Sequence, residues 1–324
     1  VGTGVVATVA LGIPTSAMAF LVIYVISSVA LNSSMVFYDA LLVDATTDER
    51  MDEVSSQGYA WGYIGSCVPF IACLLIVLNY DKLGLGLQTA MQIAFAITAA
   101  WWLVFTIPML RDVEQKHFKP RESGAIAKAI GGIGGTLKEM WSNKAIKFYM
   151  IAYFFYIDGV HTIIKLSTSY GTDLGIDATQ LVLALLVTQF VAFPSAIIYG
   201  RLSSKYGTRR MLLIAIAAYF GITLFAALFL RTATEFWVLA ILVGMFQGGI
   251  QALSRSEFGK LCPKERANEY FGFFDIFGKY AAILGTFLVG TFTAISGNSS
   301  LGVMSIAILF VIGFVMMLKV PERK

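Results

Sequence analysis

Residues 180–230 read QLVLALLVTQFVAFPSAIIYG, then RLSSKYGTRR, then MLLIAIAAYFGITLFAALFL. Two apolar runs thus flank ten residues that include four basic side chains. Each run has the roughly 20 residues that an α-helix needs to cross a bilayer. Lys and Arg gather on the cytoplasmic side of membrane proteins. The stretch therefore predicts two transmembrane helices joined by a short cytoplasmic loop.

The composition of the whole chain agrees with this reading. Of the 324 residues, 57% are hydrophobic and 14% are charged, and the mean hydropathy is +0.75. Soluble globular chains have about 45–50% apolar and about 25% charged residues, so a soluble, disordered or disulfide-rich domain is excluded. The alternating segments of about 10 residues that mark a membrane barrel are not seen. We expect an all-α polytopic membrane protein.

Apolar runs between polar breaks predict nine complete spans. Residues 1–12 resemble the tail of a further helix whose beginning lies outside the sequence, and they lack the basic region of a signal peptide. The predicted spans are 15–38, 57–79, 86–110, 146–166, 180–201, 211–230, 235–254, 270–293 and 299–318.

A long polar connection, residues 111–145, separates the third predicted span from the fourth. Apolar residues recur in it at helical spacing, with Lys128 and Lys138 elsewhere on the turn, which favours a helix lying in the membrane interface. Four glycines between 131 and 135 favour the alternative, a mobile linker. The apolar positions are Ile126, Ile130, Ile133, Leu137 and Trp141.

The basic residues orient the chain. If the 111–145 connection is cytoplasmic, 20 of the 24 Lys and Arg residues lie on that side. Lys82, Lys165 and Arg231 lie on the other side, and Lys279 lies inside a span. We therefore place the connection in the cytoplasm.

A short internal repeat indicates duplication. Residues 49–53 read ERMDE and residues 265–269 read ERANE, at an offset of 216, and both precede a Gly- and aromatic-rich span on the same side of the membrane. This favours a parallel repeat. The offset predicts that roughly 70 residues precede Val1, enough for two helices and part of a third. We expect residues 1–110 to hold the third to sixth helices of one half, and residues 146–324 to form a second half of six.

The sequence offers little for enzymatic chemistry. Its three cysteines and two histidines show no CxxC, HExxH or zinc spacing, and no phosphate loop, intact GxGxxG or GxSxG elbow is present. We expect neither an enzyme nor a cofactor.

The loop at 200–210 resembles the cytoplasmic signature of the major facilitator superfamily, roughly Gly-x-Leu-Ala-Asp-Arg-x-Gly-Arg-Arg. The matching positions are Gly200, Lys205, Gly207, Arg209 and Arg210. Ser204 stands where the family usually has Asp, and Thr208 where it often has a basic residue, so the charge relay of that loop is in doubt.

Further stretches resemble the vacuolar amino-acid effluxer family within that superfamily. They are Val36–Ala40, Tyr156–Val160, Gly248–Ser256 and Phe271–Lys279. The resemblance implies a twelve-helix facilitator with two six-helix halves, here without the first two helices and part of the third. It implies a multi-pass protein of the bacterial cell membrane or the fungal vacuolar membrane, and makes amino acids the leading substrate class. We expect a monomer in the lipid bilayer that takes a small-molecule substrate, with protons as an open option and no nucleic-acid partner.

The resemblance also implies that the fourth, seventh and tenth helices line the cavity, here spans 15–38, 146–166 and 235–254. In the seventh, Asp158 lies roughly 18 Å from the helix start, near the midplane. A carboxylate there can bind an amino group or carry a proton. The alternative is an Asp158–Lys165 pair, or Lys165 reaching the outer surface. The further binding candidates are Tyr156, His161, Thr162, Asn32, Gln247 and Gln251; the serines of the fourth helix are more typical of helix packing.

The repeat also predicts a cytoplasmic gate. At the offset of 216, Asp39 falls on Arg255, and we expect the two to pair when the inner gate is shut, with Tyr38 and Glu257 beside them. The alternative is that each pairs within its own loop. Asp275 and Lys279 lie at i and i+4 and are expected to form a structural ion pair.

Together these residues predict a secondary transporter with alternating access. The alternatives are a facilitator for a sugar, peptide or drug, and a non-transporting sensor or lipid scramblase on the same fold.

Overall fold

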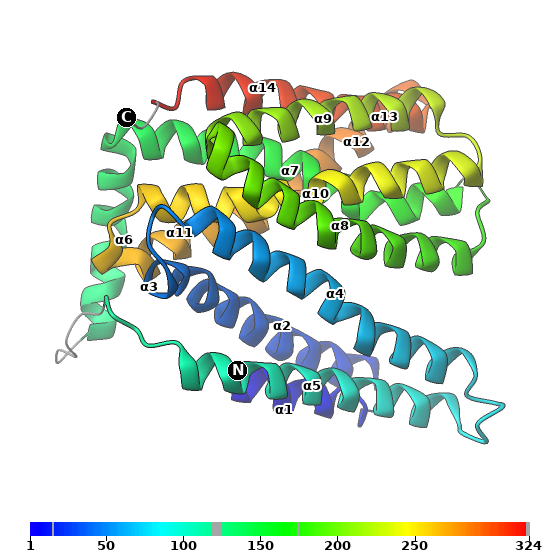
Figure 1. Ribbon diagram of the computed structural model, residues 1–324. Helices are drawn as coiled ribbons and strands as arrows, with labels where there is room; N and C mark the ends of the chain where they lie inside the picture. Colours follow the sequence, from blue (N-terminus) through cyan, green and yellow to red (C-terminus); the bar gives the residue numbers. More distant parts are fainter. Residues whose placement is uncertain (15, 118–124, 174, 322–324) are drawn as a thin grey trace. The chain divides into compact units, whose positions relative to one another are not determined.

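The computed structural model describes residues 1–14, 16–117, 125–173 and 175–321 (Figure 1). Every regular element within these ranges is helical, which confirms the all-α class. Among the described residues, eight helical stretches are long and apolar enough to cross a membrane. They include α8 (Ala178–Tyr206) and α9 (Thr208–Phe229), which extend through the predicted ten-residue loop so that only Gly207 separates them. Four basic residues used for orientation lie outside the described residues: Lys119, Arg121, Arg323 and Lys324.

The fourth predicted span, 146–166, forms α7 (Lys144–Asp173), a helix of 30 residues. It is not among the eight apolar stretches. Tyrosines, an aspartate, a histidine and lysines interrupt its apolar sequence. A membrane helix with polar residues of this kind usually faces the interior of its bundle.

The chain forms two compact units, each described here by itself. The first consists of residues 1–45 and 64–116, and the second of residues 46–63 and 117–324. The sequence-based division at 111–145 differs from this one because the start of α4 (Met51–Leu78) is bonded to helices of the second unit.

In the first unit α1 packs against α2 and α5. The hydroxyls of Thr8 and Ser27 lie 2.9 Å apart, and a Cβ on Gly4 would lie 2.2 Å from the ring of Trp102. Small residues thus bring these helices close, as in membrane bundles generally. The helices of the unit are α1 (Gly2–Ala10), α2 (Ala17–Ala40), α3 (Leu42–Ala45), the later part of α4, and α5 (Leu87–Asp112).

In the second unit α10 (Ala233–Leu261) packs along α8. Added Cβ atoms on three glycines of α10 would collide with α8: Gly244 with the Thr188 carbonyl at 2.8 Å, Gly248 with the Ala192 carbonyl at 2.9 Å, and Gly249 with the Tyr199 ring at 2.3 Å. These three glycines therefore bring the backbones of the two helices together.

The eleventh span is broken. The sequence predicts one stretch over 270–293, whereas the chain forms α11 (Ala267–Tyr280) and α12 (Ile283–Ser296). At the break Ala282 has φ of 77°, in the left-handed region that L-residues rarely adopt. The last span is divided more mildly, into α13 (Ser299–Ser305) and α14 (Ala307–Leu318).

The helix starts follow the offset found in the sequence. α2 begins at Ala17 and α10 at Ala233, 216 residues apart, and the same offset separates Met51 of α4 from Ala267 of α11. Element boundaries thus repeat in phase with the short sequence repeat.

The polar connection contains α6 (Ala125–Ser142), which crosses the ends of the long helices of its unit (Figure 1). Ile133, Leu137 and Trp141 form an exposed apolar stripe on it; the side chains of Ile126, Lys128 and Ile130 lie outside the described residues. Glu139 of α6 forms an ion pair with Arg266, at the start of α11. The hydrogen bond from this arginine lowers the pKa of the Glu139 carboxyl below its ordinary value. The interfacial position of α6 stays a prediction.

Candidate functional site

The central part of α7 presents a buried polar face. Tyr156, Asp158 and Thr162 are all 0% exposed. The helix approaches α14 closely at this level, because a Cβ on Gly159 would lie 2.6 Å from the ring of Phe310. These three candidate residues of the seventh helix therefore lie in the packed interior of the second unit.

Asp158 reaches the start of α12. The backbone N–H of Gly285 donates to Asp158 Oδ1 at 2.7 Å, and Thr162 Oγ1 donates to the same atom at 3.2 Å. A Cβ on Gly285 would lie 2.1 Å from Thr162 Oγ1 and 2.5 Å from Asp158 Oδ1. Glycine is needed there because any larger residue would fill the space through which the carboxylate contacts the helix end. Within the described chain, Asp158 Oδ2 is buried and has no hydrogen-bond partner.

The neighbouring ionisable residues of α7 point elsewhere. His161 Nδ1 lies 3.2 Å from the carbonyl of Gly278 on α11. Lys165 is exposed and forms no ion pair with Asp158 among the residues described. The expected alternative of an Asp158–Lys165 pair is therefore not what the structure contains.

Two tyrosines join α7 to α10. Tyr149 donates to the carbonyl of Ser254 at 2.6 Å, and the hydroxyls of Tyr156 and Ser254 lie 2.7 Å apart. Ser254 Oγ donates to the Ile250 carbonyl at 2.5 Å, so Tyr156 is the donor in its bond. Tyr156 therefore links α7 to α10, and its hydroxyl proton is used in the hydrogen bond to Ser254.

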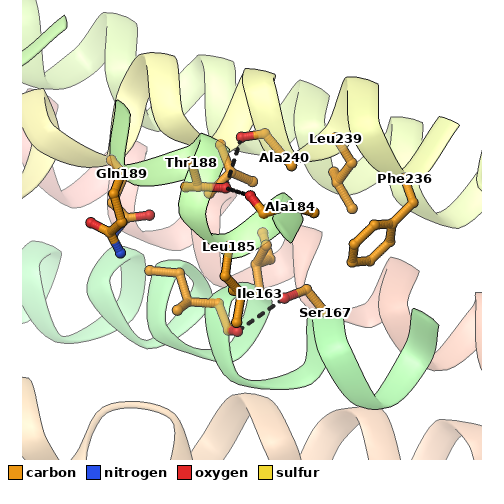
Figure 2. Close-up of a pocket in the computed structure, with 12 residues that line it drawn as sticks. Ile163, Ser167, Ala184, Leu185, Thr188, Gln189, Phe236, Leu239 and Ala240 are labelled. Atoms are coloured by element: carbon orange, nitrogen blue, oxygen red, sulfur yellow. Dashed lines mark hydrogen bonds between the residues drawn. The ribbon is translucent and has the colours of Figure 1, made fainter. Parts of the chain in front are cut away.

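A cavity lies between α7, α8 and α10 (Figure 2). Thr188 donates to the carbonyls of Ala184 and Ala240, at 2.9 and 3.2 Å. The remaining polar side chains on the lining come from Ser167, Gln189 and Gln247. Its apolar lining is made by Ile163, Ile164, Ala184, Leu185, Phe236, Leu239, Ala240 and Val243. Of the polar residues only Gln247 was predicted from the sequence. Thr188 and Gln189 are adjacent in the middle of α8, and Ser167 lies in the polar end of α7, so neither place marks a cavity by itself.

A ladder of polar contacts joins the first turns of α4 to the end of α10. Tyr63 donates to Gln251 Oε1 at 2.5 Å. Arg255 Nε donates to Ser55 Oγ at 3.0 Å, and its guanidinium carbon lies 4.7 Å from the centre of the Tyr59 ring. Arg255 is only 3% exposed. The predicted residues Gln251 and Arg255 are thus both held by α4.

Asp52 lies at the centre of these polar contacts. Its Oδ1 accepts from Ser256 Oγ and from Lys260 Nζ, each at 2.6 Å, and its Oδ2 accepts from Thr208 Oγ1 at 2.6 Å. The carboxylate is 4% exposed. We define the α4–α10 latch as Asp52, Ser55, Tyr59, Tyr63, Gln251, Arg255, Ser256 and Lys260. Sequence reasoning missed Asp52, although it lies inside the repeated ERMDE segment.

The loop motif 200–210 is built around the same contacts. Gly200 lets α8 approach α4, because a Cβ there would lie 2.6 Å from Ser56 Cβ. Gly207 ends α8 with φ of 89°. Arg209 donates to the carbonyls of Met317 and Leu318 at the end of α14, at 3.2 and 2.6 Å. Lys205 and Arg210 line a polar hollow with Glu257 and Lys260. The loop itself lacks the usual acid, and Asp52 of α4 contacts it instead through Thr208.

The other predicted residues lie apart from the cavity. In the first unit Asn32 donates to the carbonyl of Ser28 at 2.8 Å, Asp39 is buried and Tyr38 is exposed. The predicted contact between Asp39 and Arg255 stays a prediction. Lys279 pairs with Asp275 one turn away on α11. In the ranges that the structure describes, no group of three His, Cys, Asp or Glu residues could hold a metal ion.

The chain matches known families along most of its length. The model of the vacuole effluxer Atg22-like family matches residues 42–324. The MFS-type transporter YxiO of Bacillus subtilis is 45% identical over 94% of this chain and 71% of its own length. Autophagy-related protein 22 of Kluyveromyces lactis is 25% identical over 76% of this chain. The chain spans 53% of the length of that fungal relative.

Solved structures share the fold at low identity. The fucose transporter FucP in the outward conformation superposes with a TM-score of 0.72 at 12% identity, over 99% of this chain and 80% of that one. The proton:xylose symporter XylE gives a TM-score of 0.72 at 11% identity, over 99% of this chain and 78% of that one. Both are major facilitator proteins.

Proposed function

The chain belongs to the Atg22-like vacuole effluxer family of the major facilitator superfamily, and on this premise we propose that the protein is a secondary transporter with alternating access. Its substrate is a small polar solute, most simply an amino acid. Cargo binding occurs between helices of the bundle, and protons are the coupling ion.

The observation that carries the proposal is a mainly apolar cavity between α7, α8 and α10 with a few polar side chains on its lining. Small-molecule sites are mainly apolar, with a few polar groups that fix orientation. Here Gln189 and Gln247 supply amide groups, each with donors and an acceptor, beside apolar walls. Amides can bind both the carboxylate and the ammonium group of an amino acid, while the apolar wall contacts its side chain.

One observation favours a second candidate, a neutral hydroxylated solute such as a sugar. None of the described residues that line the cavity is Asp, Glu, Lys or Arg. A zwitterion usually requires at least one charged partner when it leaves water, whereas amides and hydroxyls suffice for sugar hydroxyls. The substrate panel must therefore contain both classes.

Alternating access needs contacts that form in one conformation and break in another. The α4–α10 latch supports this role, because buried polar contacts join two helices at their cytoplasmic ends. We infer that the latch closes the cytoplasmic side, and that Asp39 joins Arg255 there in the closed state.

The test is uptake into liposomes by the full-length protein. Radiolabelled amino acids and sugars are offered with and without an inward proton gradient, and the Gln247→Ala variant is measured beside Gln180→Ala. Gln180 lies in the first turn of α8 on an exposed position, so it serves as the matched control. Uptake of amino acids that Gln247→Ala weakens and Gln180→Ala does not would support the proposal. Uptake of sugars alone would establish the second candidate, and folded protein that moves neither class would overturn both.

A further inference from the structure

The break between α11 and α12 creates a helix N-terminus inside a membrane span. The first turn of α12 has backbone N–H groups with no partner inside the helix, and Ala282 at the N-cap offers no side chain to accept from them. Asp158 on α7 takes this role at a distance of 127 residues in sequence, with Oδ1 accepting from the N–H of Gly285. The positive end of the helix dipole favours a negative group at this place.

The second carboxylate oxygen is left without a partner. In the part of the chain that the structure describes, Asp158 Oδ2 is buried and accepts no hydrogen bond, although the side chain is 0% exposed. A buried polar atom of this kind costs free energy unless something satisfies it. This atom therefore points to a ligand that the protein binds in another state.

Among the side chains that the structure describes, no cationic group contacts Asp158 Oδ2. α12 and α14 carry no ionisable residue. On α11, Lys279 is paired with Asp275. On α7 itself, His161 contacts the carbonyl of Gly278 and Lys165 is exposed.

The other helices packed on α7 bring their ionisable groups to different places. On α9, Tyr219 stacks on the Phe310 ring. On α10 and α6 these groups are engaged in the contacts described above or lie at the helix ends. On the parts of these two helices whose side chains are described, they are Glu235, Arg255, Glu257, Lys260, Glu139 and the exposed Lys138.

The packing leaves room only for a very small ligand. Thr162, Gly285 and Asp158 are in direct contact, and even a methyl group on Gly285 would overlap the carboxylate. A substrate ammonium group or a hydrated cation needs several oxygen ligands and space for them, whereas a proton adds no volume. We propose that Asp158 is the proton-binding residue of this transporter, and that a proton on Oδ2 controls how firmly α12 is held at the break.

The coupling is electrostatic. The ionised carboxylate attracts the N-terminus of α12 and accepts a charge-assisted hydrogen bond from Gly285. When a proton from water at one membrane face binds the Oδ2 lone pair, the group becomes neutral and this bond weakens. The backbone at Ala282 is already in a strained conformation, so loosening of the cap lets α12 move relative to α11. No electrons are transferred, and the proton leaves again to water.

Two measurements on the full-length protein test this without any transport assay. Infrared difference spectra report protonation of a buried carboxyl group through its C=O stretch, and Asp158→Asn identifies the band. Hydrogen exchange of residues 283–288 reports the cap, with wild type and Asp158→Asn compared at the same pH so that the chemical exchange rates cancel. The asparagine is nearly isosteric and still accepts from Gly285, but it does not titrate.

We expect a carboxylic-acid band that grows on acidification in the wild type and is missing in Asp158→Asn. We also expect exchange of the α12 N-terminus in the wild type, relative to the variant, to rise about five- to tenfold over the same range, because the bond changes from charged to neutral. Gly285→Ala should loosen the cap at every pH, whereas Gly290→Ala, whose Cβ has nothing within 4 Å, should not.

The proposal fails if the band is absent, or if α12 exchanges equally in wild type and Asp158→Asn at all pH values at which the protein stays helical. Protection of α12 that follows sodium concentration and not pH would also overturn it. The proposal rests on the proposed transport function only for the role that proton binding plays, and not for the existence of the proton site. If the infrared band and the exchange difference are observed but no solute is taken up, the transport proposal is overturned and the proton site is still supported.

Discussion

Replacing Asp52 by Asn should open the α4–α10 latch. The change removes one charge and almost no volume. Asp52 accepts three hydrogen bonds, and one comes from Lys260, whose side chain is 12% exposed. Removing one partner of a buried ion pair costs about 3–5 kcal/mol. Because the lysine stem can turn its ammonium group toward water, we take the lower end, about 3 kcal/mol, which is roughly a hundredfold in the opening equilibrium.

A natural thiol reports this opening. Cys262 follows the last residue of α10, two positions after Lys260, and is 6% exposed. In a Cys67→Ser/Cys73→Ser background its alkylation rate measures how often the end of α10 separates from its neighbours. We expect Asp52→Asn to raise this rate by about a hundredfold if opening of the latch is what exposes the thiol.

The matched control is Glu53→Gln, the same chemical change at the next residue. Glu53 is 42% exposed and lies 3.6 Å from Arg50, and exposed pairs of this kind contribute little. An Asp52→Asn rate within twofold of the Glu53→Gln rate, in protein that circular dichroism shows to be helical, would refute the latch.

Three further predictions concern packing, pH and the gate. Gly249→Ala should destabilise the protein by about 1–3 kcal/mol, because its Cβ would meet a tyrosine ring of α8; Gly272→Ala, with open space around it, should leave the melting temperature unchanged. The lowered pKa of Glu139 means that its contact with α11 is fully present above the ordinary carboxyl pKa and is lost as the pH falls through the lowered value. Hydrogen exchange of residues 136–142, compared with Glu139→Gln at the same pH, should therefore rise as the pH falls below the ordinary carboxyl pKa, and the variant should lack this dependence. Reversing both charges, Asp39→Arg with Arg255→Asp, should restore the uptake lost in either single variant, and a double variant as inactive as the singles would contradict the pairing.

The helical architecture could be predicted because span length and apolar composition are local properties. The two helices predicted before and after residues 201–210 form, although they extend into that segment as far as Gly207, and the 216-residue offset reappears in the helix starts. The break at Ala281–Ala282 could not be predicted, since neither residue is a Gly or Pro signal. Its stabilisation comes from Asp158, which is distant in sequence.

Of the candidate site, the sequence predicted some residues and missed others. Asp158 stood out because a carboxylate inside a span is rare. Asp52 did not, because an acid at the start of a helix is ordinary. Its importance lies in three partners that are 156, 204 and 208 residues away. No local pattern contains that information.

The broken span has a counterpart in the first copy of the repeat. At the offset of 216, Gly285 corresponds to Pro69, which lies inside α4. A proline removes its own N–H from the helix and frees the carbonyl four residues earlier, here that of Gly65, which corresponds to Ala281 at the break. The two equivalent positions thus both weaken the backbone hydrogen bonding of their helix, by different means: α4 stays continuous through Pro69, whereas the chain breaks between α11 and α12. The proline's effect is covalent and permanent, whereas the contact of Asp158 with the N–H of Gly285 is a hydrogen bond, which can break and form again.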